Sequence, residues 1–250
     1  MNPPQEVADL LRDCAGALFT CLGDSLVGVY LYGSAVWNAY DPETSDIDVI
    51  VLLRAACTPD QIDALATLHD DLARRHPLAG TLDISYVPLT LAARHSDSTL
   101  PYYRDGHFVR QGSGDVNTVT WHTLHQHGVP IVGPPASDVI PPVSPDVLRE
   151  TMWYNLGFLS GRMPAYVARG IETTLFGVVS LCRVLHTLRT GEIASKRDAL
   201  DWARAQVGED WKPYLRNVRA LFAGDPWASA DDAMDGATAF AGHIRRLAGS

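Results

Sequence analysis

Apolar residues recur at helical spacing near the start of the chain. Over residues 5–22 they stand three or four positions apart, and Gly23 follows as a stop signal, so this pattern predicts a helix. The next apolar runs are short, rich in β-branched residues and bounded by turn residues, which is typical of strands. The predicted strands cover residues 26–32, 47–53 and 82–87. Between the last two, residues 59–75 follow an amphipathic pattern after Thr58-Pro59 and predict a second helix.

The pattern changes in the second half of the chain. A helical stretch over residues 115–127 precedes the segment GVPIVGPPASDVIPPVSPD, whose prolines cannot continue a helix or a central strand, so we expect a connector there. Beyond it the periodicity is helical only, with breaks at Pro164, Gly191 and Gly224. The helices predicted after the connector span residues 145–161, 165–190, 196–207, 211–223 and 229–248.

This change of pattern divides the chain into two parts. With 250 residues the chain is long enough for two modest domains, each with its own core. We predict an α/β (α+β) domain with a small mixed sheet over residues 1–142, followed by an all-helical bundle over residues 143–250.

Composition and charge narrow the class of protein. The net charge of −9 argues against a nucleic-acid backbone as the main partner, because such a partner needs a basic face. No uninterrupted apolar stretch is long enough for a membrane helix, and the start MNPPQEVADLL lacks the features of a signal peptide. The four widely spaced cysteines form no C-x-x-C pair. We therefore expect a cytoplasmic protein with reduced cysteines, no membrane contact and a monomeric state.

Two carboxylates open one of the predicted strands. Asp46 and Asp48 alternate with Ile47, so they should project on the same side of the strand. Two neighbouring carboxylates repel each other unless a cation lies between them, and such oxygen ligands suit Mg²⁺. The alternative is a solvated turn at the strand's start, where aspartate is common. Taken alone, the pair does not decide between the two.

Further residues point to phosphate chemistry. Gly33-Ser34 ends the preceding strand, where small residues let backbone N–H groups and a hydroxyl approach a phosphate. A third acid, Asp83, lies in the next predicted strand and can face the same side if the strands are neighbours. Three carboxylates beside a phosphate cradle suit metal-assisted phosphoryl transfer.

These motifs carry a resemblance to a known family. Gly33-Ser34, eleven residues and then Asp46-Ile-Asp48 resemble the signature of the polymerase β-type nucleotidyltransferase superfamily. The segments GVPIVGPPASDVIPPVSPDVL and TLRTGEIASKRDALDWA resemble those of the aminoglycoside (3'')(9) adenylyltransferases, the streptomycin and spectinomycin resistance enzymes. The resemblance runs over most of the chain. It implies a nucleotidyltransferase domain followed by a helical domain, and an enzyme that moves AMP from ATP to a hydroxyl of a small antibiotic.

The resemblance also implies roles for residues of the site. Asp46 and Asp48 would ligate Mg²⁺, and Ser34, beside Gly33, would contact the triphosphate of ATP. Asp83 falls where the family has a catalytic glutamate, so it would act as the base or serve mainly as a metal ligand. The cations that match the family's phosphate-binding positions are Arg183 and Lys196.

The match weakens at the positions that bind the drug. Two acidic positions of the family fall on Arg169 and Thr173, which leaves Glu172 as the nearby acid. Because Arg169 would repel a guanidinium-bearing streptomycin, we expect a spectinomycin-like aminocyclitol rather than streptomycin. An aromatic wall of the family aligns near Phe108, and Phe176 lies close to the acidic positions. Which drug, which hydroxyl and which nucleotide the chain uses is left open by the sequence.

Other candidates have weaker support. His122, His125 and His127 lie together in the sequence, but they have no partnering cysteine or acid cluster for zinc. Trp37 could stack on a nucleotide base or simply pack. The other tryptophans considered are expected in the core: Trp121, Trp153, Trp202 and Trp211. An alternative function is that of a nucleotidyltransferase of the antitoxin type that modifies a protein partner, although the added helical domain disfavours it.

Overall fold

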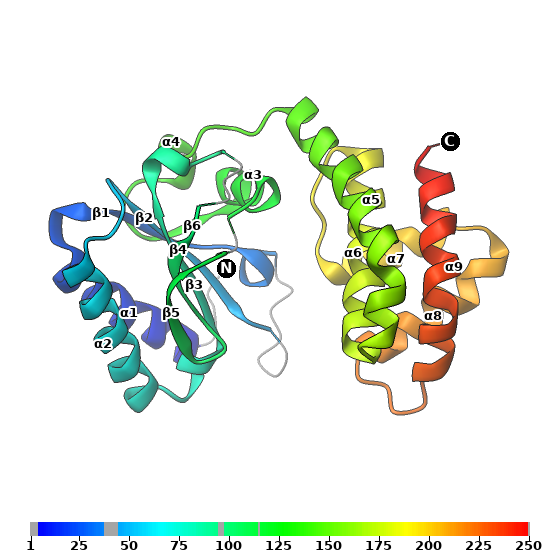
Figure 1. Ribbon diagram of the computed structural model, residues 1–250, viewed down its shortest axis with the longest axis horizontal. Coiled ribbons are helices and arrows are strands. Elements are labelled where there is room, and N and C mark those ends of the chain that lie inside the picture. Colours follow the sequence, from blue (N-terminus) through cyan, green and yellow to red (C-terminus); the bar gives the residue numbers. More distant parts are fainter. Residues whose placement is uncertain (1–4, 38–44, 95–97, 115, 250) are drawn as a thin grey trace. The chain divides into compact units, whose positions relative to one another are not determined.

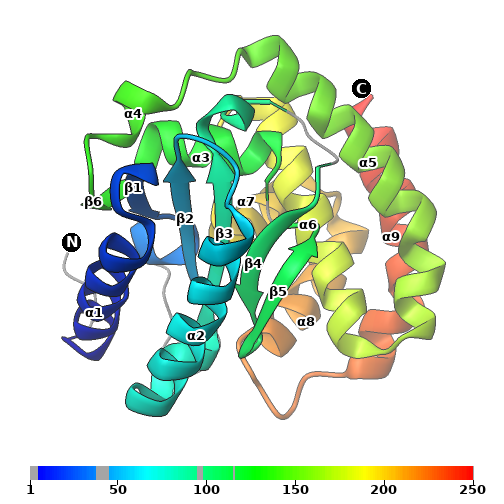
Figure 2. The same ribbon diagram turned by 60° about the vertical axis from the view of Figure 1, so that its left-hand side comes forward.

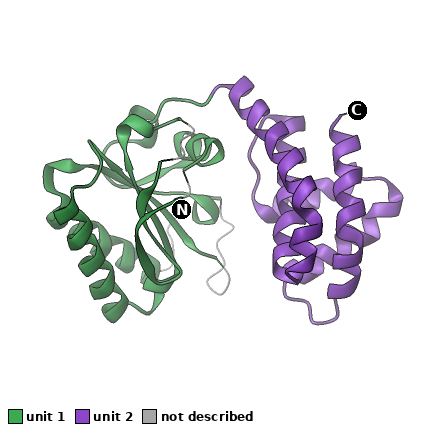
Figure 3. Cartoon of the chain, viewed as in Figure 1, with its two compact units in different colours: residues 1–143 green, residues 144–250 purple. Residues whose placement is uncertain are grey.

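The computed structural model describes residues 5–37, 45–94, 98–114 and 116–249. The chain divides into two compact units, Met1–Val143 and Ser144–Ser250 (Figure 3). The first unit holds the sheet, and the second consists of helices (Figure 1). The junction falls at the end of the proline-rich segment, next to the predicted boundary between residues 142 and 143.

A mixed sheet of six strands forms the centre of the described part of the first unit. The strands follow the order β5-β4-β3-β2-β1-β6, with β2 and β3 parallel and the other neighbouring pairs antiparallel. Their bounds are β1 (Leu26–Leu31), β2 (Ile47–Leu53), β3 (Leu82–Pro88), β4 (Leu100–Arg104), β5 (His107–Gly112) and β6 (Val129–Val132). The three strands predicted from the sequence are β1, β2 and β3, and their existence is confirmed.

The sequence prediction missed the other three strands. The hairpin β4–β5 turns at Asp105-Gly106, where both residues have positive φ values of 51° and 76°. This is the backbone conformation that Asp-Gly favours in a two-residue hairpin. The proline-rich segment is not merely a connector, as predicted, because it contains β6 and the short helix α4 (Ala136–Val139). Pro130 is tolerated in β6 because this strand lies at the edge of the sheet.

Helices cover both faces of the sheet (Figure 2). On one face α1 (Gln5–Leu22) and α2 (Pro59–Arg75) pack against Val49, Val51 and Leu53 of β2. On the other face, Ile50 and Leu52 pack in a cluster with residues of α3 (Thr118–His127) and α4. Both faces of β2 are therefore buried, and strand alternation decides which helices each side chain meets. Predicted helices 5–22 and 59–75 are confirmed as α1 and α2, whereas α3 begins later than predicted because Asn117 caps it.

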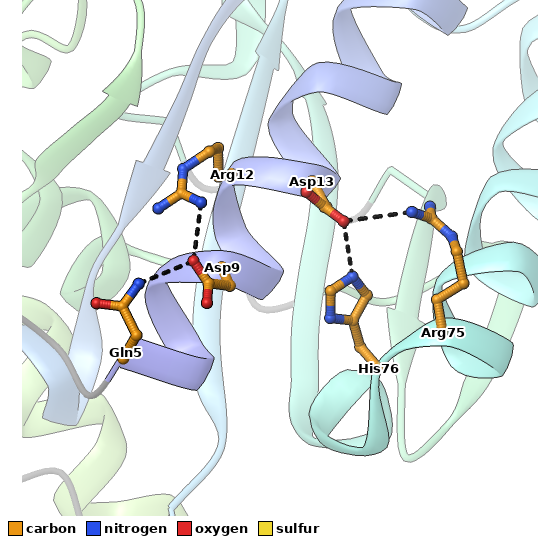
Figure 4. Close-up of polar contacts among 6 residues, drawn as sticks. All are labelled: Gln5, Asp9, Arg12, Asp13, Arg75 and His76. Atoms are coloured by element: carbon orange, nitrogen blue, oxygen red, sulfur yellow. Dashed lines mark hydrogen bonds and ion pairs between the residues drawn. The ribbon is translucent and has the colours of Figure 1, made fainter.

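Polar contacts at the surface connect α1 with the end of α2 (Figure 4). Asp13 on α1 accepts from Nη1 of Arg75 at 3.3 Å and lies 2.9 Å from Nε2 of His76. Within α1, Asp9 accepts from Gln5 at 2.9 Å and from Arg12 at 2.8 Å. Because these groups are partly exposed, each pair contributes about 0.2–1 kcal/mol to stability. The apolar contacts beneath them contribute more to the packing of the two helices.

A histidine is buried in the core between α2 and the sheet. His69 is 1% exposed, stacks on Tyr103 with ring centroids 4.0 Å apart, and shares a hydrogen bond of 2.6 Å between its Nε2 and the hydroxyl of Tyr86. Phe108 stacks against the same imidazole at 5.5 Å. Burial lowers the pKa of His69 to about 3, because a charged imidazolium would lose its hydration there.

Because His69 is buried, we expect the folded protein to lose stability in mild acid. The pKa of His69 is lower in the folded chain than the ordinary value of 6.5, so the unfolded chain binds the extra proton. The stability that neutral His69 contributes is complete above pH 6.5 and is lost as pH falls toward about 3, by up to ~1.4 kcal/mol per pH unit. Urea unfolding between pH 7 and pH 4 measures this slope.

The matched control is the exposed histidine at position 107. His69→Gln should flatten the pH dependence in this window, whereas His107→Gln should keep the wild-type slope. Equal slopes for the wild type and His69→Gln would contradict this account.

The described part of the second unit consists of helices. Their bounds are α5 (Pro145–Ala168), α6 (Ile171–Thr190), α7 (Lys196–Gln206), α8 (Lys212–Phe222) and α9 (Ala230–Ala248). The predicted break at Pro164 is wrong: α5 runs through this proline, and the chain turns instead at Gly170, whose φ is 105°. Trp153 is also not a core residue, because it is 43% exposed on α5.

Among the described helices, α6 is long and apolar enough to cross a membrane by length and composition. It packs against α5, α7 and α9, and 56% of its apolar window is buried inside the structure. These contacts are those of the core helix of a bundle, so its apolar composition is explained by packing.

Candidate active site

Charged residues of neighbouring strands lie close together at one end of the sheet, where β2 and β3 begin. The register of the parallel strands β2 and β3 pairs Asp48 with Asp83, so two carboxylates lie side by side near the starts of these strands. Because β4 runs antiparallel to β3, its last residue, Arg104, comes next to Asp83. Gly33 follows β1, on the other side of Asp48. The strand order β4-β3-β2-β1 therefore places Arg104, Asp83, Asp48 and Gly33 in a row.

Gly33 passes very close to the Asp48 carboxylate. Its φ of 68° lies in the left-handed region, and a Cβ on this residue would stand 1.9 Å from Oδ2 of Asp48. The neighbouring amide of Tyr32 donates to the main-chain oxygen of Asp48 at 3.0 Å. Glycine is thus required at this point, and a ligand bound to the Asp48 carboxylate would also lie beside the backbone that begins η2 (Gly33–Val36).

Asp83 forms an ion pair with Arg104. Nε of Arg104 donates to Oδ2 of Asp83 at 2.7 Å, and the guanidinium lies over the ring of Tyr102 at 5.6 Å. The side chain of Asp83 is 14% exposed and that of Arg104 is 37% exposed. The arginine therefore supplies positive charge next to two carboxylates that would otherwise repel each other.

Two further predicted residues lie at this edge but outside the strands. Asp46 precedes the first residue of β2 and is exposed, and Ser34 is half-buried in η2. Within the described ranges, no three histidine, cysteine or acidic side chains lie close enough together to hold a metal ion. The structure thus brings Asp48 and Asp83 together, but it does not assemble the three carboxylates into one ready cluster.

The residues present nevertheless fit a hard divalent cation at Asp48. Mg²⁺ binds one or two protein carboxylates and keeps water or phosphate oxygens in its remaining positions. Oδ2 of Asp48 lies where a Cβ on Gly33 would stand, so no side chain at position 33 crowds this carboxylate. Asp46 can supply the second carboxylate from the residues just before β2.

The second unit brings the two predicted phosphate-binding cations to one helix end. Arg183 on α6 donates from Nε to the main-chain oxygen of Ala194 at 3.0 Å. Ser195 then caps α7, accepting from the amide of Asp198, and the exposed Lys196 is the first residue of this helix. Two cations beside the N-terminus of a helix favour an anion at this point.

The predicted substrate residues belong to different units. Glu172 is exposed in the first turn of α6, and the hydroxyl of Thr173 donates to the main-chain oxygens of Tyr166 and Gly170, at 2.6 and 3.1 Å. Phe108 is half-buried on β5 and packs on His69. Thr173 and Phe108 thus have structural contacts of their own, and a role of these three residues toward a substrate stays a prediction.

The remaining aromatic and histidine candidates have local contacts. Trp37 meets His127 edge to face, with ring centroids 6.1 Å apart. Nδ1 of His125 lies 2.8 Å from the main-chain oxygen of Ile140. These contacts pack the end of α3 against its neighbours.

Sequence reasoning missed Arg104. A signal was present, because Asp105-Gly106 marks a hairpin whose first strand ends at Arg104. The neighbour of β4 could not be read from that signal, so the contact with Asp83 was out of reach.

The chain is similar in sequence to known adenylyltransferases. The sequence profile described as "Aminoglycoside adenylyltransferase, C-terminal domain" matches residues 138–246. The chain is 26% identical to an aminoglycoside (3'') (9) adenylyltransferase from Shigella flexneri, over 92% of this chain and 91% of that protein. It is 22% identical to a spectinomycin 9-adenylyltransferase from Campylobacter jejuni, over 85% of each. The chain resembles the aminoglycoside adenylyltransferases in both of its units.

Among solved structures, the chain resembles a spectinomycin adenyltransferase AAD(9) from Enterococcus faecialis, crystallised with ATP and spectinomycin. The TM-score is 0.73 at 12% identity, and the match covers 97% of this chain and 99% of the other. At this identity the likeness shows the fold. The predicted fold, a nucleotidyltransferase domain with a small mixed sheet followed by helices, is confirmed. With adenylyltransferases as relatives along its length, the chain is an enzyme of the adenylyltransferase type.

Proposed function

We propose that the protein transfers AMP from ATP to a hydroxyl of a small antibiotic, an aminoglycoside or aminocyclitol. The observation that supports this most is the row of Gly33, Asp48 and Asp83 at one sheet edge, in a chain whose relatives are aminoglycoside and spectinomycin adenylyltransferases. The reaction is attack of the hydroxyl on the α-phosphorus of ATP, with pyrophosphate leaving in line.

We propose a different chemical role for each group of residues in the site. Asp46 and Asp48 would hold Mg²⁺, which when bound neutralises charge on the phosphate oxygens. Ser34 and the backbone at Gly33 would orient the triphosphate beside Asp48, and Asp83 would face the attacking hydroxyl. Arg183 and Lys196 would contact nucleotide phosphates from the second unit.

For the antibiotic, we propose a spectinomycin-like aminocyclitol rather than streptomycin. Arg169 ends α5 next to the turn that leads to Glu172 and Thr173, so this turn carries a cation beside a single acid. A guanidinium-bearing drug would be repelled there, whereas the single acid Glu172 suits a ligand with an amine and no guanidinium.

Mass spectrometry tests the proposal. The protein is incubated with ATP, Mg²⁺ and a panel that includes spectinomycin, streptomycin and other aminocyclitols, and each product is examined for an added AMP. We expect AMP on spectinomycin or a related aminocyclitol, and none in a parallel reaction with Asp48→Asn. The opposing result is an unmodified panel together with AMP on proteins of a cell lysate, which would favour the protein-modifying alternative.

A further inference from the structure

A cation that sequence reasoning did not assign lies in the row of active-site residues. Arg104 donates from Nε to Oδ2 of Asp83 at 2.7 Å and is itself held over the ring of Tyr102. The register of β3 and β4 pairs Ile84 with Tyr103, so Asp83 and Arg104 are the next facing pair toward the sheet edge. The contact is therefore set by two strands of the sheet rather than by mobile side chains alone.

The burial of this pair differs from that of a nearby surface pair. Asp83 and Arg104 are 14% and 37% exposed, whereas Asp63 and Arg110, on α2 and β5, are 65% and 59% exposed. Solvent screens the outer pair strongly and the inner pair much less. The ion pair with Arg104 is therefore expected to restrain the Asp83 carboxylate more than the exposed pair restrains Asp63.

We propose that Arg104 is a positioning residue that keeps Asp83 out of the metal site and holds its carboxylate for the substrate hydroxyl. The inference rests on the proposed function and deepens it. Asp83 already has a cationic partner, and its carboxylate forms no three-residue metal cluster with other described acids. A divalent cation then binds at Asp48 and Asp46, on the side of the row next to the Gly33 backbone.

The charge of Arg104 should have a measurable effect on where a divalent cation binds. With Arg104 in place, a divalent cation approaching Asp83 meets a guanidinium that repels it. If that guanidinium is removed, Asp83 becomes a third carboxylate, next to Asp48 and Asp46, that can bind the cation. Removing Arg104 should therefore tighten divalent-ion binding while it impairs turnover, a combination that a merely structural ion pair does not produce.

The first test measures Mn²⁺ binding to the protein without substrates, by electron paramagnetic resonance or calorimetry. We expect Asp48→Asn to weaken Mn²⁺ binding by roughly tenfold or more, and Asp83→Asn to change it by less than about threefold. Arg104→Gln should tighten it by roughly three- to tenfold, and Asp83→Asn in the Arg104→Gln background should remove that gain. Asp83→Asn weakening Mn²⁺ binding as much as Asp48→Asn would overturn the proposal.

Steady-state kinetics provides the second test. Arg104→Gln should lower kcat by about 10²-fold with KM for ATP nearly unchanged, since the hydroxyl loses its positioned partner but the nucleotide site stays intact. Guanidinium ion added to Arg104→Ala should restore part of the lost kcat. Arg110→Gln is the matched control and should keep wild-type kinetics and Mn²⁺ binding. Arg104 variants that behave like Arg110→Gln would refute the positioning role.

Two features keep the test decisive. Arg104→Lys retains the charge without the guanidinium Nε, so if Arg104→Gln does not fold, the lysine variant should still show a lower kcat with wild-type Mn²⁺ affinity. A wild-type kcat for that variant would count against the proposal. Because the Mn²⁺ titrations need no turnover, they judge the metal assignment even if the antibiotic panel is not modified, and so separate failure of this inference from failure of the proposed function.

Discussion

Replacement of Asp48 by asparagine is expected to lower AMP transfer by about three orders of magnitude, which corresponds to ~4 kcal/mol of lost transition-state stabilisation. The carboxylate lies beside Gly33 on one side and Asp83 on the other, so it is the proposed metal ligand with the most neighbours in the site. Asparagine keeps the size and one oxygen but removes the charge that binds a divalent cation. Pyrophosphate release in the presence of ATP, Mg²⁺ and spectinomycin measures the effect.

The fold should survive this substitution. Loss of charge at Asp48 relieves repulsion toward Asp83, so urea unfolding of Asp48→Asn should stay cooperative with a midpoint no lower than that of the wild type. Asp70→Asn, on the exposed side of α2, is the control that should leave activity unchanged. Full activity of Asp48→Asn would remove Asp48 from the metal site.

Replacement of Gly33 by alanine is the second large expected effect. A Cβ at this position would stand 1.9 Å from Oδ2 and 2.7 Å from Cγ of Asp48, so the carboxylate must move. A displacement of that kind is expected to lower kcat by about 10²-fold, since the reaction depends on the placement of charged groups. The positive φ adds a stability loss of about 1–2 kcal/mol. Turnover and urea unfolding of the same preparation separate the two effects.

A second glycine isolates the contact from the backbone strain. Gly23 also has a positive φ, 51°, but a Cβ there would meet nothing within 4 Å. Gly23→Ala should therefore lose a similar amount of stability and keep its activity. If both alanine variants retained wild-type kcat, the close approach of Gly33 to Asp48 would have no part in the reaction.

Parts of the fold set by local patterns were predictable from the sequence. The apolar runs of β2 and β3 are buried on both faces, which gives a strong signal, and the amphipathic α1 and α2 have clear ends. The break predicted at Pro164 is wrong, because α5 continues through this exposed proline and the turn falls at Gly170. Strand β6 was missed because proline is excluded from central strands but not from an edge.

The sequence predicts which residues of the candidate site lie near the ends of strands. It does not predict which residues of different strands face one another. Asp48 and Asp83 could be placed at the starts of two strands, and a parallel pairing of those strands brings them together. Arg104 could not be assigned to them, because its partner depends on which strand the hairpin joins in the sheet. The contact of Arg183 with Ala194, two residues before Lys196, likewise depends on packing of α6 against α7.

The order of the strands leaves β5 and β6 as the two outer strands of the described sheet. Pro130 removes a donor from the four-residue β6, and β5 carries His107 and Arg110 as exposed polar side chains. Short length, proline and charge on outer strands all disfavour pairing with a strand of another chain. The sheet is thereby protected against growth by addition of further copies, and concentrated preparations should resist β-type aggregation.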